Sequence, residues 1–184
     1  MENNQKTLKE SIEFNGVGLH TGEKVCLIIN PAKENHGIKF QRIDLPEAPI
    51  IPADIDLVKD TQRSTTLELN NVRIITVEHL MSALYALGVN NVLIKMNSSE
   101  VPILDGSAKL FVEGIQKVGL KAQNASLKII HLPKTINFTD TQSGSEILFV
   151  PANNFRLSVV LDYQNPVLGT QYAEIRNLKN YPEE

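Results

Sequence analysis

Residues 73–88 read RIITVEHLMSALYALG, and their hydrophobic period changes from two to about 3.6 residues after position 76. Up to Thr76 the pattern is typical of an extended strand. From Val77 onward, apolar residues recur at positions 77, 80, 81, 84 and 87, which is the spacing of one helical face. Thr76 is a preferred N-cap residue, and Gly88 is a preferred residue just past a helix. The stretch therefore predicts a strand followed directly by a helix over 77–87.

Strand signals dominate on the N-terminal side of this helix, and a second helix is expected on its C-terminal side. Apolar and β-branched runs bounded by turn residues predict strands over 8–14, 24–30, 37–43, 62–69 and 90–96. Asn70 and Asn71 predict a hairpin turn, and the apolar spacing over 107–118 predicts a helix closed by Gly119. We therefore expect an α+β fold, a two-layer arrangement of a sheet on helices, in a first domain spanning 1–122.

The remaining segment, 123–184, carries strand signals and no helical pattern. Residues 121–126 predict a polar linker, and strands are expected over 127–132, 135–138, 146–150, 156–162 and 170–175. A sheet without a second layer leaves apolar area in water and favours aggregation. We therefore interpret 123–184 as the truncated, strand-rich start of a second, similar α+β domain, and the chain as part of a longer protein.

The composition excludes collagen-like, coiled-coil and wholly disordered proteins. The chain has 184 residues, 42% of them hydrophobic and 21% charged, with a net charge of −3, which is typical of a globular protein. Its Lys and Arg residues are scattered, which argues against a nucleic-acid partner. One cysteine excludes an intrachain disulfide, and the apolar run around Cys26 predicts a buried core position. No apolar run approaches the roughly 20 residues of a transmembrane segment, and no signal-peptide pattern is present, so we expect a cytoplasmic location.

Glu78 and His79 are the candidate catalytic pair. On a helical wheel both project away from the apolar stripe, in the first turn of the expected helix. A neutral imidazole is a good zinc ligand, and a carboxylate beside a zinc-bound water can take its proton. The alternative is a solvated first turn in which Glu78 only complements the helix dipole. The usual two-histidine helix motif needs a second His four residues on, and that position is Ala83.

A second segment, GVGLHTG over residues 16–22, contains three glycines around His20. Glycines permit tight backbone geometry, so a phosphate-binding loop is one interpretation. The segment lacks the Lys-Ser/Thr ending and the strand-to-helix context that such a loop requires. The alternative interpretation is a plain hairpin connection between two strands.

Three motifs together resemble one family. GVGLHTG over 16–22, TVEHLMSAL over 76–84 and EVPILDGSA over 100–108 occur in the order and spacing of the zinc-dependent UDP-3-O-acyl-N-acetylglucosamine deacetylases of lipid A biosynthesis. PAKENHG over 31–37 and QRID over 41–44 further resemble the subgroup fused to a 3-hydroxyacyl-acyl-carrier-protein dehydratase. The resemblance implies two α+β domains of similar architecture with the active site between them.

The resemblance also assigns roles to residues. It implies that Glu78 is the general base, that His79 is the first zinc ligand, and that His20 lies near the mouth of the active site. Residues 60–66 match a strand that borders the substrate, with Thr61 and Ser64 as substrate-binding candidates. The other two zinc ligands, an oxyanion-stabilising Thr and a general-acid His are expected beyond residue 184. We therefore expect the 184-residue chain alone to be inactive.

Two other functions stay open at the level of sequence. One is a non-catalytic α+β binding domain, although the net charge of −3 disfavours nucleic acid as its ligand. The other is a deacetylase of the same mechanism that acts on a different acyl-amino sugar. The expected partner of the resembling family is a small molecule, a nucleotide-linked acylated amino sugar.

Overall fold

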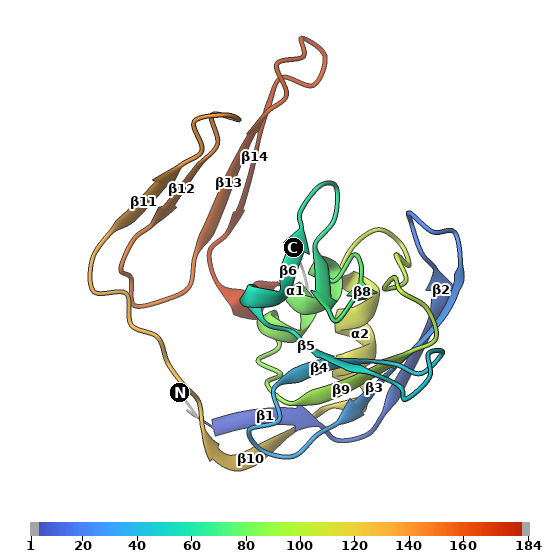
Figure 1. Ribbon diagram of the computed structural model, residues 1–184. Helices are drawn as coiled ribbons and strands as arrows, with labels where there is room; N and C mark the ends of the chain where they lie inside the picture. Colours follow the sequence, from blue (N-terminus) through green and yellow to red (C-terminus); the bar gives the residue numbers. More distant parts are fainter. Residues whose placement is uncertain (1–3, 182–184) are drawn as a thin grey trace. The chain divides into compact units, whose positions relative to one another are not determined.

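The computed structural model describes residues 4–181, which divide into two compact units (Figure 1). The first unit extends to residue 127 and the second begins at residue 128. Together they contain helices and several sheets, so the α+β prediction is confirmed. Neither helix in the described part of the chain is long and apolar enough to cross a membrane.

A five-stranded sheet is the frame of the first unit. Its order is β2-β3-β9-β4-β5, with β2 Ile12–Val17, β3 Lys24–Pro31, β9 Val92–Met96, β4 Ile38–Arg42 and β5 Ile50–Pro52. Only β4 and β9 pair in parallel, and the other neighbours are antiparallel. The buried positions of β3 and β9 alternate along each strand, so one face of the sheet carries the core residues.

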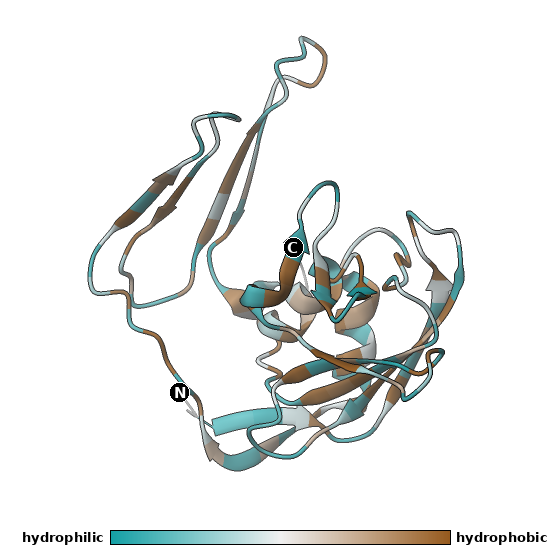
Figure 2. Cartoon of the chain, viewed as in Figure 1, coloured by the Kyte–Doolittle hydropathy of each residue, from teal (hydrophilic) through white to brown (hydrophobic). Residues whose placement is uncertain are grey.

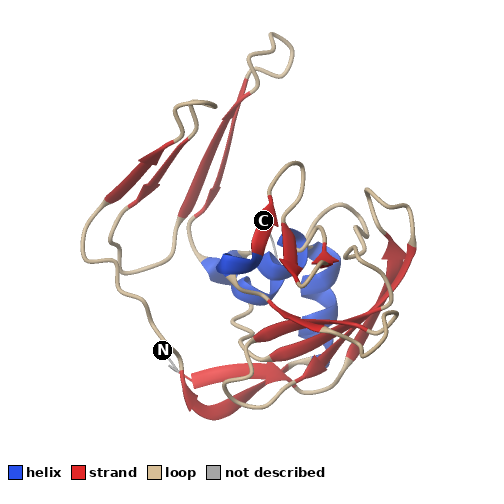
Figure 3. Ribbon diagram, viewed as in Figure 1, coloured by secondary structure: helices blue, strands red, loops and turns tan. Residues whose placement is uncertain are grey.

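Two helices, α1 Glu78–Ala86 and α2 Lys109–Val118, form the second layer (Figure 3). Each buries three residues against the sheet: Leu80, Ala83 and Leu84 from α1, and Phe111, Val112 and Ile115 from α2. The approach of α2 to β2 is close, because a Cβ at Gly114 would lie 2.7 Å from the Phe14 ring. That ring packs on Phe111 edge to face at 5.0 Å. The first unit is therefore the expected sheet on two helices.

Smaller strands complete the first unit. The meander β6 Val58–Asp60, β7 Thr66–Leu69 and β8 Val72–Ile74 leads directly into α1, preceded by the 3-10 turn η1 Ile55–Leu57. Its tight turn has Asn70 and Asn71 at φ 51° and 64°, so the predicted hairpin turn is confirmed. Strand β1 Asn4–Leu8 pairs with β10 Leu120–Ser126.

Several local predictions were wrong, each for a structural reason. Residues 121–126 are not a linker, because they lie in β10 and bond to β1. The expected strand over 8–14 is interrupted, since β1 ends at Leu8 and β2 begins at Ile12. Cys26 is only half-buried, because it alternates with the buried Val25 and Leu27 and points to the other face of the sheet. Burial and the nearby Glu13 raise the pKa of its thiol.

The second unit contains two antiparallel hairpins. One pairs β11 Ile136–Thr139 with β12 Glu146–Phe149, and the other pairs β13 Leu157–Asp162 with β14 Thr170–Ile175. Residues 127–132, expected as a strand, have no regular structure, and η2 Leu178–Asn180 is the only helical turn among described residues 128–181.

These hairpins are rich in apolar residues, as the brown strands of Figure 2 show. Every residue of β11, β12 and β13 is exposed. Phe138, Leu148 and Val160 each expose about 60% of their surface (59%, 62% and 64%). An apolar sheet face of this kind needs a covering layer. The interpretation of this unit as the start of a second domain stays a prediction.

Candidate active site

Glu78 and His79 lie in the first turn of α1, half-buried, at the end of the β7-β8 hairpin. The backbone N–H of Thr65 donates a 2.9 Å hydrogen bond to Oε2 of Glu78. The backbone N–H of Val77 in turn donates to the Thr65 carbonyl at 3.3 Å. The carboxylate is therefore oriented by backbone immediately before β7. The buried face of α1 is formed by Leu80, Ala83 and Leu84 and does not include His79, as the helical wheel predicted.

The residue before this helix was predicted as its N-cap, and that prediction was wrong. Thr76 is buried with a φ of 60°, and the N-cap position is Val77, which has no side-chain cap. The Thr76 hydroxyl instead donates to Oε1 of Glu100 at 2.9 Å. A left-handed backbone is costly for a β-branched residue, so this contact marks a conformation imposed by its surroundings.

Residues 18–23 connect β2 and β3, so the hairpin interpretation of the glycine-rich segment is confirmed. The turn is closed by hydrogen bonds between Gly18 and Glu23 and between Gly22 and Gly18, both 3.0 Å. The backbone N–H groups of His20 and Thr21 point inward to the Glu100 carboxylate, while the His20 side chain is exposed. His20 therefore lies at the tip of a fixed turn.

Glu100 is the residue that sequence reasoning missed. Its exposed fraction is 0%, and its carboxylate accepts hydrogen bonds from His20, Thr21 and Thr76. Burial raises the pKa of this carboxyl, but the hydrogen bonds outweigh burial and hold the pKa below its ordinary value. The available signal was a carboxylate directly before the apolar run VPIL at 101–104.

The two substrate-binding candidates lie in the connection between β6 and β7, where the expected strand begins only at Thr66. Thr61 is exposed, and Ser64 is half-buried beside Thr65, which binds Glu78. The connection turns at Arg63, which has a φ of 61°. The structure thus places Ser64 beside the backbone that orients Glu78, and Thr61 farther out on the same connection.

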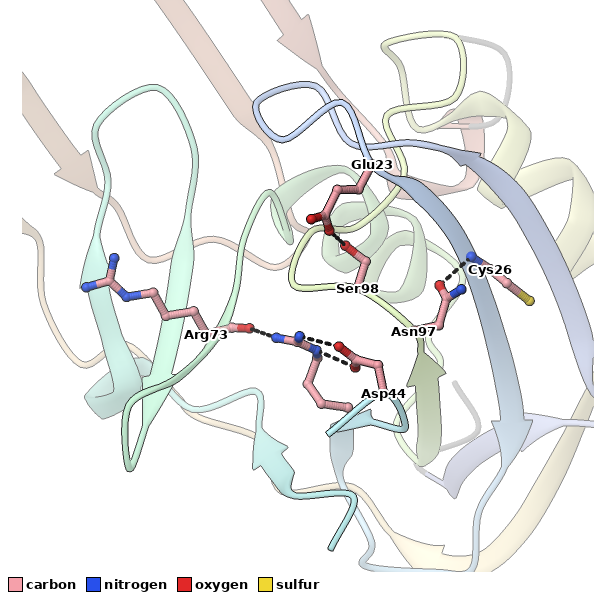
Figure 4. A network of polar contacts seen from close by, with 7 residues as sticks. Glu23, Cys26, Asp44, Arg73, Asn97 and Ser98 are labelled. Carbon is pink, nitrogen blue, oxygen red and sulfur yellow. Dashed lines mark hydrogen bonds and ion pairs between the residues drawn. The ribbon is translucent and has the colours of Figure 1, made fainter. Parts of the chain in front are cut away.

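A second set of polar contacts holds the hairpin that precedes α1 (Figure 4). Arg42 makes two hydrogen bonds to the carboxylate of Asp44, at 2.6 and 2.8 Å, and a third to the Arg73 carbonyl at 3.1 Å. The Arg42 hydrogen bonds lower the pKa of Asp44 despite its partial burial. Because Arg73 lies in β8, this guanidinium ties the sheet to the strand that leads into α1.

Two further contacts in the same view hold the turn that carries His20. Ser98 donates to the Glu23 carboxylate at 2.7 Å, and the Cys26 backbone N–H donates to the Asn97 side chain at 2.8 Å. Residues 97–100 therefore contact the tip of the β2–β3 connection, its last residue Glu23 and the start of β3.

The candidate metal ligands among residues 4–181 do not gather into a metal centre. Within residues 4–181 no group of three or more His, Cys, Asp or Glu side chains could hold a metal ion. His79 can supply one imidazole nitrogen beside the Glu78 carboxylate. Structural and catalytic zinc sites use three or four protein ligands, so the described residues do not form a complete zinc site.

A carboxylate oriented by backbone, next to an imidazole on one helical turn, is a combination used by metal-assisted hydrolases. The family model described as UDP-3-O-acyl N-acetylglycosamine deacetylase (LpxC) matches residues 5–184, and this chain belongs to that family. The resemblance drawn from the three motifs is thereby confirmed.

Curated relatives include both single-function and fused enzymes. The chain is 44% identical over 180 residues to the bifunctional enzyme LpxC/FabZ of Bacteroides thetaiotaomicron, covering 98% of this chain and 39% of that protein. It is 47% identical over 163 residues to the UDP-3-O-acyl-N-acetylglucosamine deacetylase of Teredinibacter turnerae, covering 89% and 53%. It is 37% identical over 174 residues to the LpxC/FabZ enzyme of Chlorobaculum tepidum, covering 95% and 37%. The chain thus spans about half or less of the length of these relatives.

Proposed function

We propose that this chain forms part of a zinc-dependent deacetylase that removes the acetyl group from UDP-3-O-acyl-N-acetylglucosamine in lipid A biosynthesis. The observation that carries the proposal is the family match over 5–184 together with the oriented Glu78–His79 pair in α1. The remaining zinc ligands and the general acid are proposed to lie in the part of the relatives that this chain does not span.

In this proposal Glu78 is the general base. The Thr65 N–H holds Oε2, so the carboxylate keeps one orientation while it accepts a proton from the attacking water. His79 contributes one zinc-binding nitrogen. Consecutive helical residues diverge by about 100°, so the imidazole and the carboxylate approach the same water from different directions. When bound, zinc supplies polarisation of the acetamide carbonyl and a more acidic water.

The loops beside this pair are proposed to contact the substrate. His20 projects from the β2–β3 turn, and Thr61 and Ser64 lie on the β6–β7 connection. Hydroxyl and imidazole groups are suited to the hydroxyls and phosphates of a nucleotide-linked sugar. A fused 3-hydroxyacyl-acyl-carrier-protein dehydratase is part of the proposal, because two relatives that cover 98% and 95% of this chain are LpxC/FabZ enzymes.

The test is deacetylation of UDP-3-O-acyl-N-acetylglucosamine by the full-length protein that contains this chain, with acetate release measured by mass spectrometry. Activity that is lost on zinc removal and restored by zinc supports the proposal. Glu78→Gln should abolish most of the activity, whereas Glu113→Gln, on an exposed face of α2, should retain it. Activity that is independent of zinc, or that survives in Glu78→Gln, would overturn the proposal.

A further inference from the structure

The carboxylate of Glu100 joins two segments that are distant in the sequence, the turn at His20 and Thr21 and the segment at Thr76. From the β2–β3 turn it accepts the backbone N–H of His20, at 3.0 and 3.1 Å to its two oxygens. Thr21 adds its backbone N–H at 2.8 Å and its hydroxyl at 2.9 Å. From the segment before α1 it accepts the Thr76 hydroxyl at 2.9 Å. Oε1 and Oε2 are thus both occupied, and each segment contributes donors.

These donors, and not a cation, satisfy the buried charge. The ion pairs among residues 4–181 do not include Glu100, although its exposed fraction is 0%. A buried carboxylate without such donors would be strongly unfavourable, so the donors and the carboxylate fix one another. A loss of the carboxylate would release the turn and the start of the helix together.

Gly18 gives an independent sign that the turn is fitted to this carboxylate. A Cβ built at Gly18 would overlap both Oε2 of Glu100 and the hydroxyl of Thr21. Real Cβ atoms do not approach other atoms so closely, so only glycine permits the turn to close over Glu100.

The other end of the network sets the start of α1. Backbone hydrogen bonds join Ile75 to Ser99 at 2.8 Å and Val101 to Ile75 at 3.0 Å. One residue later, Thr76 takes its left-handed φ of 60° with its hydroxyl on Glu100. Residues 75 and 76, directly before α1, are therefore held by residues 99–101 through both backbone and side-chain hydrogen bonds.

We infer that Glu100 is a positioning residue, which aligns the His20 turn with the Glu78–His79 end of α1 by binding His20, Thr21 and Thr76 at once. The inference rests on the proposed function for its catalytic consequence. The coupling of the turn to the helix through Glu100 does not depend on which substrate the protein binds.

Kinetics of the full-length protein test the catalytic consequence. Thr76→Val removes the hydroxyl with little change of shape, and Glu100→Ala removes the whole acceptor. Both should lower kcat about tenfold to a hundredfold per zinc-loaded, folded molecule, with a smaller change in KM, because misplacing a base or a ligand by about 1 Å has that effect. Glu100→Gln should retain most of kcat. Its amide oxygen can accept from Thr21, and its amide nitrogen can donate to the Thr76 hydroxyl oxygen.

The matched control is Thr7→Val in β1. Thr7 is also buried, and its hydroxyl donates to the Asn91 carbonyl at 2.6 Å, in a region that the network of Glu100 does not include. This variant should lower the melting temperature without lowering kcat. If Thr76→Val and Glu100→Ala behave like the control, with unchanged kcat, Glu100 is only a structural residue and the inference is overturned.

Hydrogen exchange in the 184-residue chain separates this inference from the proposed function. In Glu100→Ala, the amides of His20 and Thr21 should exchange about tenfold faster or more, and the NMR signals of Glu78 and His79 should move. The Cys26 amide, which is bound to Asn97, is the internal control and should keep its protection. This result with an inactive full-length protein would refute the proposed function alone. Unchanged exchange at His20 and Thr21, together with unmoved Glu78 and His79 signals, would refute the inference.

Discussion

Replacing Gly18 by alanine measures how tightly the β2–β3 turn closes over Glu100. The added Cβ would overlap the carboxylate of Glu100 and the hydroxyl of Thr21, so the turn or the carboxylate must shift. Inserting a methyl group into a filled, buried site costs about 1–3 kcal/mol. A partial loss of the charge-assisted hydrogen bonds from His20 and Thr21 adds to this cost. We expect the free energy of unfolding of the first unit to fall by about 2–3 kcal/mol.

Urea unfolding followed by the helical circular dichroism signal is a suitable assay, because α1 and α2 both lie in the first unit. A double-mutant cycle isolates the overlap. Glu100→Ala removes the carboxylate atoms that the new Cβ would meet, and it releases the Thr21 hydroxyl from its acceptor so that this group can rotate away. Gly18→Ala should therefore cost at least about 1 kcal/mol less in that background. Gly37→Ala is the control, since a Cβ at Gly37 meets nothing within 4 Å and only its φ of 74° is strained.

The cost of Gly37→Ala should be the same, within about 0.5 kcal/mol, with or without Glu100. If the costs of Gly18→Ala and Glu100→Ala are also additive within about 0.5 kcal/mol, the turn is not fitted to the carboxylate.

Three further predictions concern the frame around the site. Arg42→Ala should destabilise the first unit by about 2 kcal/mol, measured by urea unfolding, because it leaves Asp44 and the Arg73 carbonyl without their shared donor; a loss below about 0.5 kcal/mol would contradict this role. Glu100 has a lowered pKa, so its contribution to stability is complete above about pH 4.5 and falls as the pH drops through the folded-state pKa. Urea midpoints should therefore fall less steeply with acid in Glu100→Gln, and equal slopes would refute the assignment. Hydrogen exchange should be fast in the exposed strands of the second unit and slow in α1, and equal protection would contradict the difference in packing.

Elements with a strong hydrophobic period were predictable from the sequence. The helix expected over 77–87 is α1, Glu78–Ala86, because its buried Leu80 and Leu84 impose a single face on the core. The helix expected over 107–118 is α2, Lys109–Val118, closed by Gly119 at φ 76°. The hairpin turn at 70–71 was equally predictable from its two asparagines, which adopt a positive φ at low cost.

Features that depend on distant partners were not predictable. Thr76 is of a residue type preferred at N-caps, but its hydroxyl donates a hydrogen bond to Glu100, 24 residues away. Residues 121–126 are polar because β10 pairs only with β1 and exposes most of its side chains. Glu100 itself is chemically ordinary in the sequence, and its burial arises only when the β2–β3 turn folds over it. Local pattern carries no information about such long-range acceptors.

Zinc content and kcat of the full-length protein together test the roles proposed for Glu78 and His79. His79→Ala removes a proposed ligand, so zinc content and activity should fall together. Glu78→Gln leaves the ligands in place, so zinc should stay bound while kcat falls by roughly 10²–10⁴, the usual contribution of a positioned general base. If Glu78→Gln loses zinc while His79→Ala keeps it, the two roles are reversed. If both variants keep zinc and full activity, the first turn of α1 is an ordinary solvated helix end and neither residue has the proposed role.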